Sequence, residues 1–320
     1  MGACAGKMEM IKDEPLRGIT FYIMATIIFT VADTIAKTLT CCLPAVQITW
    51  MRYIVFTGFA LMMTWRRSGP AFHVHSPRLQ LARGLCLAAS SILFILGIRD
   101  IGLAEAATIG FLGPIMVTVL SIPLLGEVVG LRRWAAVAAG MLGVLIVLRP
   151  GTGTFQPEGL YRVGSAMFWA IGLILTRKMA GTDRAETTMF WSALTGLIVL
   201  SAAIPFSIVM PSPRELWLAL AQSVLSSAGQ WLVIQSLRYT PASILAAFSY
   251  TQLLWSTIAG FLVFSVLPDR WTWLGAAIII ASGVYTAHRE RVRALDGSSD
   301  ATPEDCDGRK GKDDTGAVRQ

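Results

Sequence analysis

The chain has 320 residues, of which 54% are hydrophobic and only 15% are charged. A soluble domain carries about 25% charged residues, so a soluble fold could not hide this much apolar surface. The net charge of +7 would suggest nucleic acid in a soluble protein. Here the basic residues cluster in alternate loops, which indicates orientation in a membrane and no nucleic-acid partner. The 5 cysteines lack metal-ligand spacing and the 3 histidines lie at loops or span ends, so we expect neither a metal nor a cofactor.

Ten apolar segments, most of about 20 residues, can each cross about 30 Å of hydrocarbon. Their backbone must satisfy its own hydrogen bonds in lipid, so each segment is expected to be a helix. The predicted fold class is therefore an all-α polytopic membrane protein with ten transmembrane helices. In chain order the expected spans are residues 18–39, 45–65, 79–98, 103–125, 133–148, 159–175, 185–210, 216–237, 243–266 and 271–287.

The regions outside the spans are polar. The first segment, residues 1–17, lacks the apolar core and cleavage site of a secretory signal, so we expect the first span to be retained. Residues 289–320 are charged and glycine-rich, which predicts a disordered cytoplasmic tail. Lys and Arg gather at one set of loops, which places both termini in the cytoplasm and the protein in the inner (plasma) membrane.

The chain also repeats itself, because Leu81–Arg149 resembles Leu220–His288 with spans and loops in register, and Phe111 falls on Tyr250. Five spans per copy is an odd number, so the second copy enters from the opposite side and the two repeats must be inverted. Internal symmetry of this kind is a mark of secondary transporters. The expected repeats are residues 18–149 and 159–288, joined by a periplasmic linker over residues 150–158.

Charged side chains inside the spans need a reason, because each costs about 2.5–3.5 kcal/mol at the bilayer centre. Asp33 and Lys37 share one helix face, roughly 22 Å and 28 Å from the cytoplasmic start of the first span. Arg52 and Glu105 lie roughly 10 Å and 4 Å inside their spans from the outer side. These four residues form either a neutral structural cluster or a substrate or proton site that opens outward. Arg83, one turn into its span, is expected to snorkel to the cytoplasmic interface.

The second half offers polar and aromatic groups instead of charges. A buried glutamine must find partners, so Gln230 and Gln252 are expected to face the protein interior or a cavity. They make either interhelical hydrogen bonds or contacts with a polar or aromatic substrate. The candidate binding residues of this group are Trp169, Gln230, Tyr250, Gln252 and Trp255.

Small residues on the fifth and tenth spans, among them Gly143 and Gly275, permit close helix approach. Two interpretations stay open for them, tight packing within one chain and a homodimer seam.

Several short motifs, in order and spacing, resemble the drug/metabolite transporter superfamily, in its ten-helix type built from two EamA domains. The resemblance covers about Arg17 to Arg291 and implies a transporter with two inverted five-helix repeats. Glu127 has no carboxylate counterpart in the second half, where the matching place reads Ser265-Val266-Leu267. The motifs are Ala104-Glu105-Ala106-Ala107, Phe111-Leu112-Gly113-Pro114, Leu124-Leu125-Gly126-Glu127 and Leu148-Arg149-Pro150-Gly151, then Pro241-Ala242-Ser243, Tyr250, Pro268-Asp269 and Gly275–Tyr285.

No metalloprotease, P-loop, nucleophile-elbow or Cys/His metal pattern occurs, so we do not expect an enzyme. We expect a secondary transporter that moves a small polar or amphipathic metabolite across the inner membrane by alternating access. The alternative transport function is multidrug or metabolite efflux by proton exchange. Alternatives from other functional classes are a noncatalytic scaffold or receptor and an intramembrane enzyme. The expected partners are a small-molecule substrate and the lipid bilayer, while a proton or counter-substrate and a homodimer stay open.

Overall fold

The computed structural model describes residues 15–66, 74–125, 131–149, 157–179, 185–206, 208–240, 245 and 248–299. Within these ranges it contains helices joined by turns and no strand. Seven helical segments are long and apolar enough to cross a membrane, and two shorter apolar helices accompany them. The described part is thus that of an all-helical polytopic membrane protein, as predicted. Its elements are α1 (Pro15–Leu39), α2 (Ala45–Arg66), α3 (Pro77–Asp100), α4 (Leu103–Gly110), α5 (Leu112–Leu125), α6 (Leu131–Leu148), α7 (Gly159–Met179), α8 (Ala185–Ala203), η1 (Ile204–Phe206), α9 (Pro213–Tyr239), α11 (Thr251–Phe264) and α12 (Arg270–Ser299).

Two predicted spans are interrupted where the sequence predicted continuous helices. The span over residues 103–125 divides at Phe111 into α4 and α5. Pro114 has no N–H to donate to the Gly110 carbonyl, so the helical ladder fails there. The Phe111 amide ends α4 with a shared bond, to the Ala107 carbonyl oxygen four residues back and to the Thr108 carbonyl oxygen three residues back, both at 3.2 Å. In the span over residues 243–266, Tyr250 forms a turn directly before α11.

The predicted tail is also shorter than expected, because α12 continues to Ser299. Residues 289–299 are helical, and the prediction of disorder from Arg289 is wrong for them. The physical reason is that extending an existing helix needs no new nucleus, and the Arg, Glu, Ala and Leu residues here favour a helix. Residues 300–320 of the predicted tail, residues 1–14 of the predicted first segment and residues 150–156 of the predicted linker lie outside the described residues.

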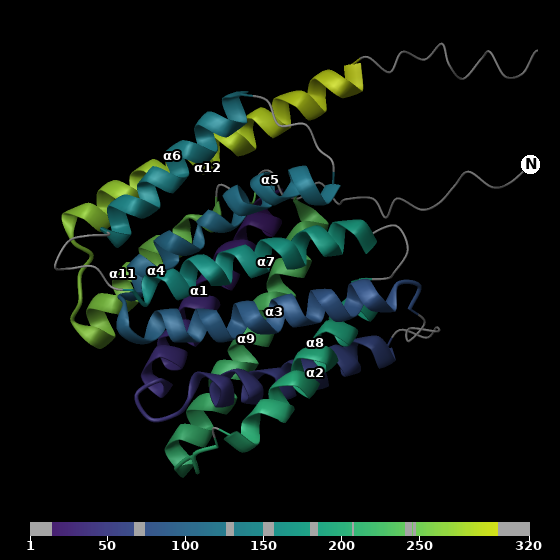
Figure 1. Ribbon diagram of the computed structural model, residues 1–320, viewed down its shortest axis with the longest axis vertical. Helices are drawn as coiled ribbons and strands as arrows, with labels where there is room; N and C mark the ends of the chain where they lie inside the picture. Colours follow the sequence, from purple (N-terminus) through teal and green to yellow (C-terminus); the bar gives the residue numbers. More distant parts are fainter. Residues whose placement is uncertain are drawn as a thin grey trace, which may run out of the picture.

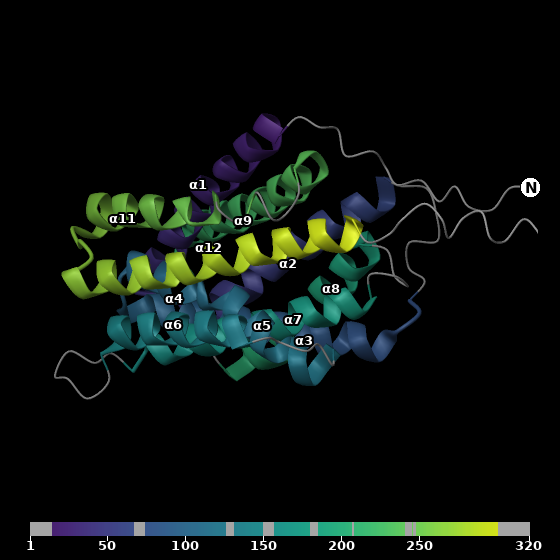
Figure 2. The ribbon, with the colours of Figure 1, turned by 90° about the horizontal axis from the view of Figure 1, so that it is seen from above.

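The helices pack in reciprocal pairs. α1 lies against α9 and α3 against α7, while α5 contacts α7 and α1 contacts α11. Figure 1 shows α6 beside α12 at one edge of the molecule and α2 beside α8 at the opposite edge, and Figure 2 shows the same molecule from above. The first helix of each predicted repeat therefore packs against the third span of the other. The largest apolar core lies around the α4–α5 break, where Ile109 is 1% exposed and Leu112 is 0% exposed.

The small residues of α6 and α12 serve packing inside this chain. A Cβ added at Gly143 would lie 3.0 Å from the Gly275 carbonyl oxygen, and one added at Gly275 would lie 2.6 Å from the Gly143 carbonyl oxygen. The two backbones therefore touch where these glycines face each other. Of the two interpretations, these contacts support packing within the chain.

Candidate functional site

Arg162 of α7 is a buried charge at the junction of three helices. Its side chain is 7% exposed. Nε and Nη2 donate to the Ala106 carbonyl oxygen of α4 at 3.0 and 2.9 Å. The guanidinium carbon lies 4.5 Å from the centre of the Phe94 ring of α3, a cation–π distance. The predicted candidates leave out Arg162, although it is a charged residue inside a predicted span, the signal that singled out Asp33.

Two glycines make room for this arginine. A Cβ at Gly97 of α3 would lie 2.5 Å from Arg162 Cγ, and one at Gly110 of α4 would overlap Arg162 Nη2. Glycine is therefore needed on both neighbouring helices for the guanidinium to reach Ala106.

Lys37, a member of the predicted charge cluster, caps the C-terminal end of α3. Its Nζ donates to the carbonyl oxygens of Ile98, Arg99 and Ile101 at 2.7, 3.2 and 2.5 Å. An ammonium has three donors, so all of them are used. The last carbonyls of a helix lack intrahelical partners and carry partial negative charge, which a cation stabilises. This geometry favours a structural role for Lys37.

Asp33 lies one helical turn before Lys37 on α1, on the same face. Because Lys37 is held at Ile98, this register places Asp33 near Phe94, one turn earlier on α3, where Arg162 stacks. Arg162, and Arg52 of the predicted cluster, are the arginines to consider as partners of Asp33. Within the described residues, however, no hydrogen bond or ion pair joins Asp33 to either arginine. The Asp33 side chain is half-buried.

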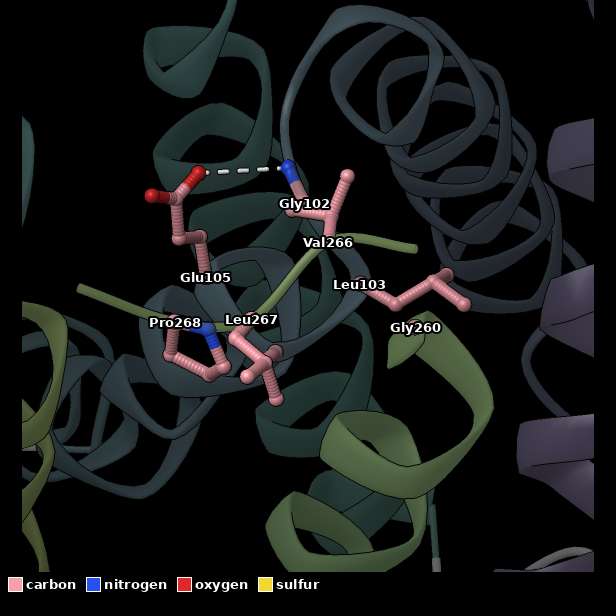
Figure 3. Close-up of a pocket in the computed structure, with 8 residues that line it drawn as sticks. Gly102, Leu103, Glu105, Gly260, Val266, Leu267 and Pro268 are labelled. Atoms are coloured by element: carbon pink, nitrogen blue, oxygen red, sulfur yellow. Dashed lines mark hydrogen bonds between the residues drawn. The ribbon is translucent and has the colours of Figure 1, made fainter. Parts of the chain in front are cut away.

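Glu105 belongs to a separate cluster, at the end of the molecule where α3 ends and α12 begins. Figure 3 shows its carboxylate reaching the Gly102 amide, a bond of 3.1 Å that caps α4. The other carboxylate oxygen lies 3.3 Å from the Thr272 hydroxyl oxygen. Leu267 and Pro268, from the segment between α11 and α12, line a small cavity of about 20 Å³ together with Glu105.

A larger pocket of about 260 Å³ lies beside it, lined by Glu105, Arg149 and Asp269 among apolar residues. Arg149 Nη2 is paired with the Asp269 carboxylate. Asp269 Oδ1 also accepts the Thr272 amide and hydroxyl, both at 2.8 Å, and so caps the start of α12. Burial alone would raise the pKa of Asp269, but the hydrogen bonds from Thr272 and the charge of Arg149 hold it below its ordinary value.

The two helix interruptions meet through their aromatic residues. The Phe111 and Tyr250 rings are 4.9 Å apart at an interplanar angle of 62°, an edge-to-face contact. Trp169 of α7 lies against the same break, because a Cβ at Gly113 would be 3.0 Å from its ring. Thr251, the first residue of α11, also contacts α1, because its hydroxyl oxygen lies 3.3 Å from that of Thr26.

The remaining predicted candidates are less closely connected. Gln230 is exposed on α9, so the prediction that it faces inward gains no support. Gln252 is half-buried next to Thr251. Trp255 Nε1 is buried and has no hydrogen-bond partner within the described residues. The structure thus brings Tyr250 and Trp169 to the helix breaks, while Lys37 and Glu105 lie at helix ends.

The snorkelling predicted for Arg83 is wrong. Its Nε donates to Thr176 Oγ1 at 2.6 Å and its Nη1 to the Thr188 carbonyl oxygen at 3.0 Å, with a further bond to Ser192 Oγ. Hydroxyl and carbonyl oxygens of α7 and α8 thus solvate the guanidinium inside the bundle, so it does not need to reach the interface.

Interrupted apolar helices and charges inside the membrane-spanning region are features of membrane transporters. Comparisons with known proteins also identify a transporter. The model of the EamA-like transporter family matches residues 16–149 and again residues 158–286. This chain belongs to the EamA-like transporter family, and it is a transporter rather than an enzyme.

Three curated relatives are transporters of different metabolites. The chain is 25% identical over 280 residues to the S-adenosylmethionine uptake transporter of Rickettsia prowazekii, covering 86% of this chain and 94% of that one. It is 26% identical over 290 residues to the riboflavin transporter of Rhizobium johnstonii, covering 88% and 95%. It is 23% identical over 284 residues to the pseudopaline exporter of Pseudomonas aeruginosa, covering 88% and 100%. A solved crystal structure shares the fold with a TM-score of 0.60 at 19% identity, covering 86% of this chain and 98% of that one.

Proposed function

We propose that this protein is a secondary transporter that moves a small polar or amphipathic metabolite across the inner membrane by alternating access. The observation that carries the proposal is the contact between Phe111 and Tyr250, at the interruptions of two helices, one from each predicted repeat. Transporters built from inverted repeats bind substrate between the repeats, at helices that are interrupted there. The substrate would lie beside these two rings and Trp169.

The interruptions supply polar groups in an apolar interior. The end of α4 and the start of α11 carry partial charge, as helix ends do, although the Ala107 and Thr108 carbonyl oxygens accept from the Phe111 amide and the Leu253 amide donates to the Tyr250 carbonyl oxygen. Arg162 donates to the Ala106 carbonyl oxygen, one turn before the end of α4. Rocking of one repeat against the other would open this region first to one side of the membrane and then to the other, with both termini in the cytoplasm.

The experiment is uptake by liposomes that contain the purified protein. We expect saturable accumulation of at least one metabolite from a radiolabelled panel that includes S-adenosylmethionine and riboflavin, substrates named for its relatives. Tyr250→Ala should lower the initial rate at least fivefold. The control Trp65→Ala, at a side chain 86% exposed, should retain the rate.

Two results would count against the proposal. A correctly folded protein that moves no member of a broad metabolite panel would favour the scaffold or receptor alternative. Consumption of a solute without its movement across the membrane would favour an intramembrane enzyme.

Proton-driven efflux is the second candidate, and Asp33 is the observation that favours it. This interior carboxylate makes no ion pair within the described residues, so it is available to take up and release a proton. An imposed pH gradient should then drive substrate movement in the wild type but not in Asp33→Asn. Stimulation by substrate preloaded on the far side, without any gradient, would instead indicate exchange.

A further inference from the structure

We propose that the ion pair between Arg149 and Asp269 is a clasp, which holds the ends of α6 and α12 together beside the 260 Å³ pocket and must open before solute enters that pocket. The clasp lies at the end of the molecule where α3 ends and α12 begins, the outer end in the predicted topology. This role rests on the proposed transport function, because it names how one side of the transporter closes.

α6 and α12 lie side by side (Figure 1) and touch at a pair of glycines. A Cβ at Gly143 or at Gly275 would lie 3.0 or 2.6 Å from the carbonyl oxygen of the other glycine. Arg149 follows Gly143 by six residues and Asp269 precedes Gly275 by six residues, so each charge lies about 9 Å along its helix from this contact. The glycines can therefore act as a pivot, and residues 144–149 and 269–274 form two arms that the ion pair joins at their tips.

The clasp links two helix ends whose own backbones are held. The Arg149 amide donates to the Leu145 carbonyl oxygen at 2.8 Å and so continues α6. Asp269 caps α12, because its carbonyl oxygen accepts the Trp273 amide at 3.1 Å and its carboxylate accepts the Thr272 amide at 2.8 Å. The side-chain pair therefore connects the two helices themselves, one from each predicted repeat.

The clasp is also part of the wall of the pocket. Ile109, which is 1% exposed, belongs both to this wall and to the apolar core around the α4–α5 break. The pocket therefore extends from the clasp to the core. The lining residues from the two arms and the segment before α12 are Val147, Leu148, Arg149, Leu267 and Asp269.

The backbone beside the pocket is strained at two points. Within the described residues, two non-glycine residues have a positive φ: Arg149 with 47°, directly after α6, and Ser265 with 55°, directly after α11. Side chains rarely adopt this conformation, and residues that do so gather at clamps and switch regions. Val266 and Leu267, in the segment that leads to α12 (Figure 3), are 52% and 62% exposed. Little apolar burial holds this segment, so it can follow a movement of the α12 arm.

A second ion pair at this end of the molecule provides a matched control. Arg99 and Asp100 lie 3.8 Å apart, but they are neighbours in the last turn of α3 and are 61% and 51% exposed. Their pairing joins no two elements. Changes to this pair alter the charge at the same end of the molecule and leave the arms fastened.

The first test measures access to the pocket and needs no transport. In a background in which the five native cysteines are replaced by serine, Ile109→Cys places one thiol in the pocket wall. The probe is 2-hydroxyethyl methanethiosulfonate, which is uncharged, so that its rate does not report the loss of an arginine. It is applied to the purified full-length protein in detergent. We expect Arg149→Gln to raise the labelling rate at least fivefold, because the arms part.

Two further variants define that result. Arg149→Lys keeps the positive charge and should label more slowly than Arg149→Gln. Asp100→Asn should stay within twofold of the parent protein. Labelling of Arg149→Gln within twofold of the parent protein, or an equal increase in Asp100→Asn, would overturn the clasp.

The second test fastens the arms covalently. In the same cysteine-free background, Arg149→Cys/Asp269→Cys replaces the ion pair by two thiols that a bifunctional methanethiosulfonate can join. We expect the uptake rate in liposomes to fall at least tenfold on cross-linking and to return on reduction with dithiothreitol. Arg99→Cys/Asp100→Cys, cross-linked within α3 alone, should retain its uptake rate.

This test also decides the question if Arg149→Gln does not fold. Unchanged uptake after cross-linking that mass spectrometry shows to be complete would overturn the clasp and uphold transport. A protein that moves no solute before cross-linking would instead contradict the proposed function, and the labelling rates would still show whether the ion pair closes the pocket.

Discussion

At the scale of single residues, the position of the Arg162 side chain depends on two neighbouring glycines, which leave room for it. Gly97 and Gly110 have no side chain where the guanidinium passes, and the Phe94 ring lies under it. Protein interiors tolerate added atoms poorly, and overpacking typically costs about 1–3 kcal/mol. Gly97, Gly110 and Phe94 therefore fix the position of Arg162.

The corresponding prediction concerns Gly97→Ala. The new methyl group would lie 2.5 Å from Arg162 Cγ, so we expect a loss of about 1–3 kcal/mol of stability and a several-fold lower uptake rate. Melting temperature and initial rate are the measurements. The control is Gly58→Ala on α2, where a Cβ meets nothing within 4 Å. Equal behaviour of the two variants would mean that α3 shifts freely and that Arg162 is not held by this contact.

The pair Asp33 and Arg52 permits a second prediction at this scale. Because no ion pair joins them within the described residues, neutralising both should not restore what neutralising Asp33 removes. We expect Asp33→Asn and Asp33→Asn/Arg52→Gln to show similarly low uptake at comparable expression. Full recovery of uptake in the double variant would demonstrate a purely structural charge pair.

Residue roles were only partly predictable from the sequence. The depth of Asp33 and Lys37 within their span follows from helix geometry, but their partners do not. Lys37 serves the carbonyls of α3 because the Ile98–Ile101 turn ends beside it, a fact of tertiary packing. Arg83 is similar, because its hydroxyl partners Thr176 and Ser192 lie on two other helices. Its own sequence neighbourhood therefore does not predict them.

At the scale of elements, the interruption between α4 and α5 is the feature most open to test. Pro114→Ala restores the N–H that a continuous helix needs at this position. We expect the variant to be at least as stable as the wild type, because the ladder can close, and to transport several-fold more slowly, because the Phe111 ring moves. Pro123→Ala is the control, since Pro123 lies inside α5 without dividing it. A Pro114→Ala protein with normal uptake would show that the break is not needed for transport.

The start of α12 gives a prediction on pH. The pKa of Asp269 is held below its ordinary value by the Thr272 and Arg149 contacts, which outweigh burial. A carboxyl with a lowered folded-state pKa stabilises the protein above its unfolded-state pKa of about 3.9 and loses that contribution as the pH falls through the folded-state value. Asp269→Asn should therefore melt at a lower temperature than the wild type at pH 7, and the gap should shrink below about pH 4.

The matched control for this prediction is Asp100→Asn. Asp100 lies 3.8 Å from Arg99, and the two side chains are 51% and 61% exposed. Exposed pairs of this kind contribute little, about 0–1 kcal/mol. Its melting temperature should follow that of the wild type at every pH. A gap for Asp269→Asn that stays constant down to pH 3 would contradict a role for its ionised form.

Elements were more predictable than residues. Within the described residues a helix lies at every predicted span, because lipid leaves the backbone no alternative. The predicted span over residues 185–210 is too long, since α8 ends at Ala203 and residues 208–210 are not helical. The interruptions were missed although their cause is local for α4, where Pro114 follows Gly113, since an apolar run conceals a break inside it. The extension of α12 differs from the prediction for the opposite reason, because low apolar content does not exclude a helix that continues from a preceding span.

At the scale of the whole molecule, the inverted topology is a proposal with a direct test. Reporter fusions after Arg67 and after Arg293 should report the cytoplasm, and one near Cys42 should report the periplasm, because loop arginines gather on the cytoplasmic side. An outer location of the C-terminal reporter would refute the ten-span count and the inversion together. Reciprocal packing of α1 with α9 and α3 with α7 is what the inversion leads us to expect.

The length of α12 has a practical consequence for measuring motion. Beyond the predicted end of its span at Ala287, the helix runs through residues 288–299, about 18 Å at about 1.5 Å per residue. Because α12 packs along α6, with their backbones in contact at Gly143 and Gly275, any tilt of one against the other is carried out along this extension. A small rotation of α12 at the glycines would therefore displace the far end of the helix by several ångströms. A spin label or fluorophore attached near that end would report this displacement.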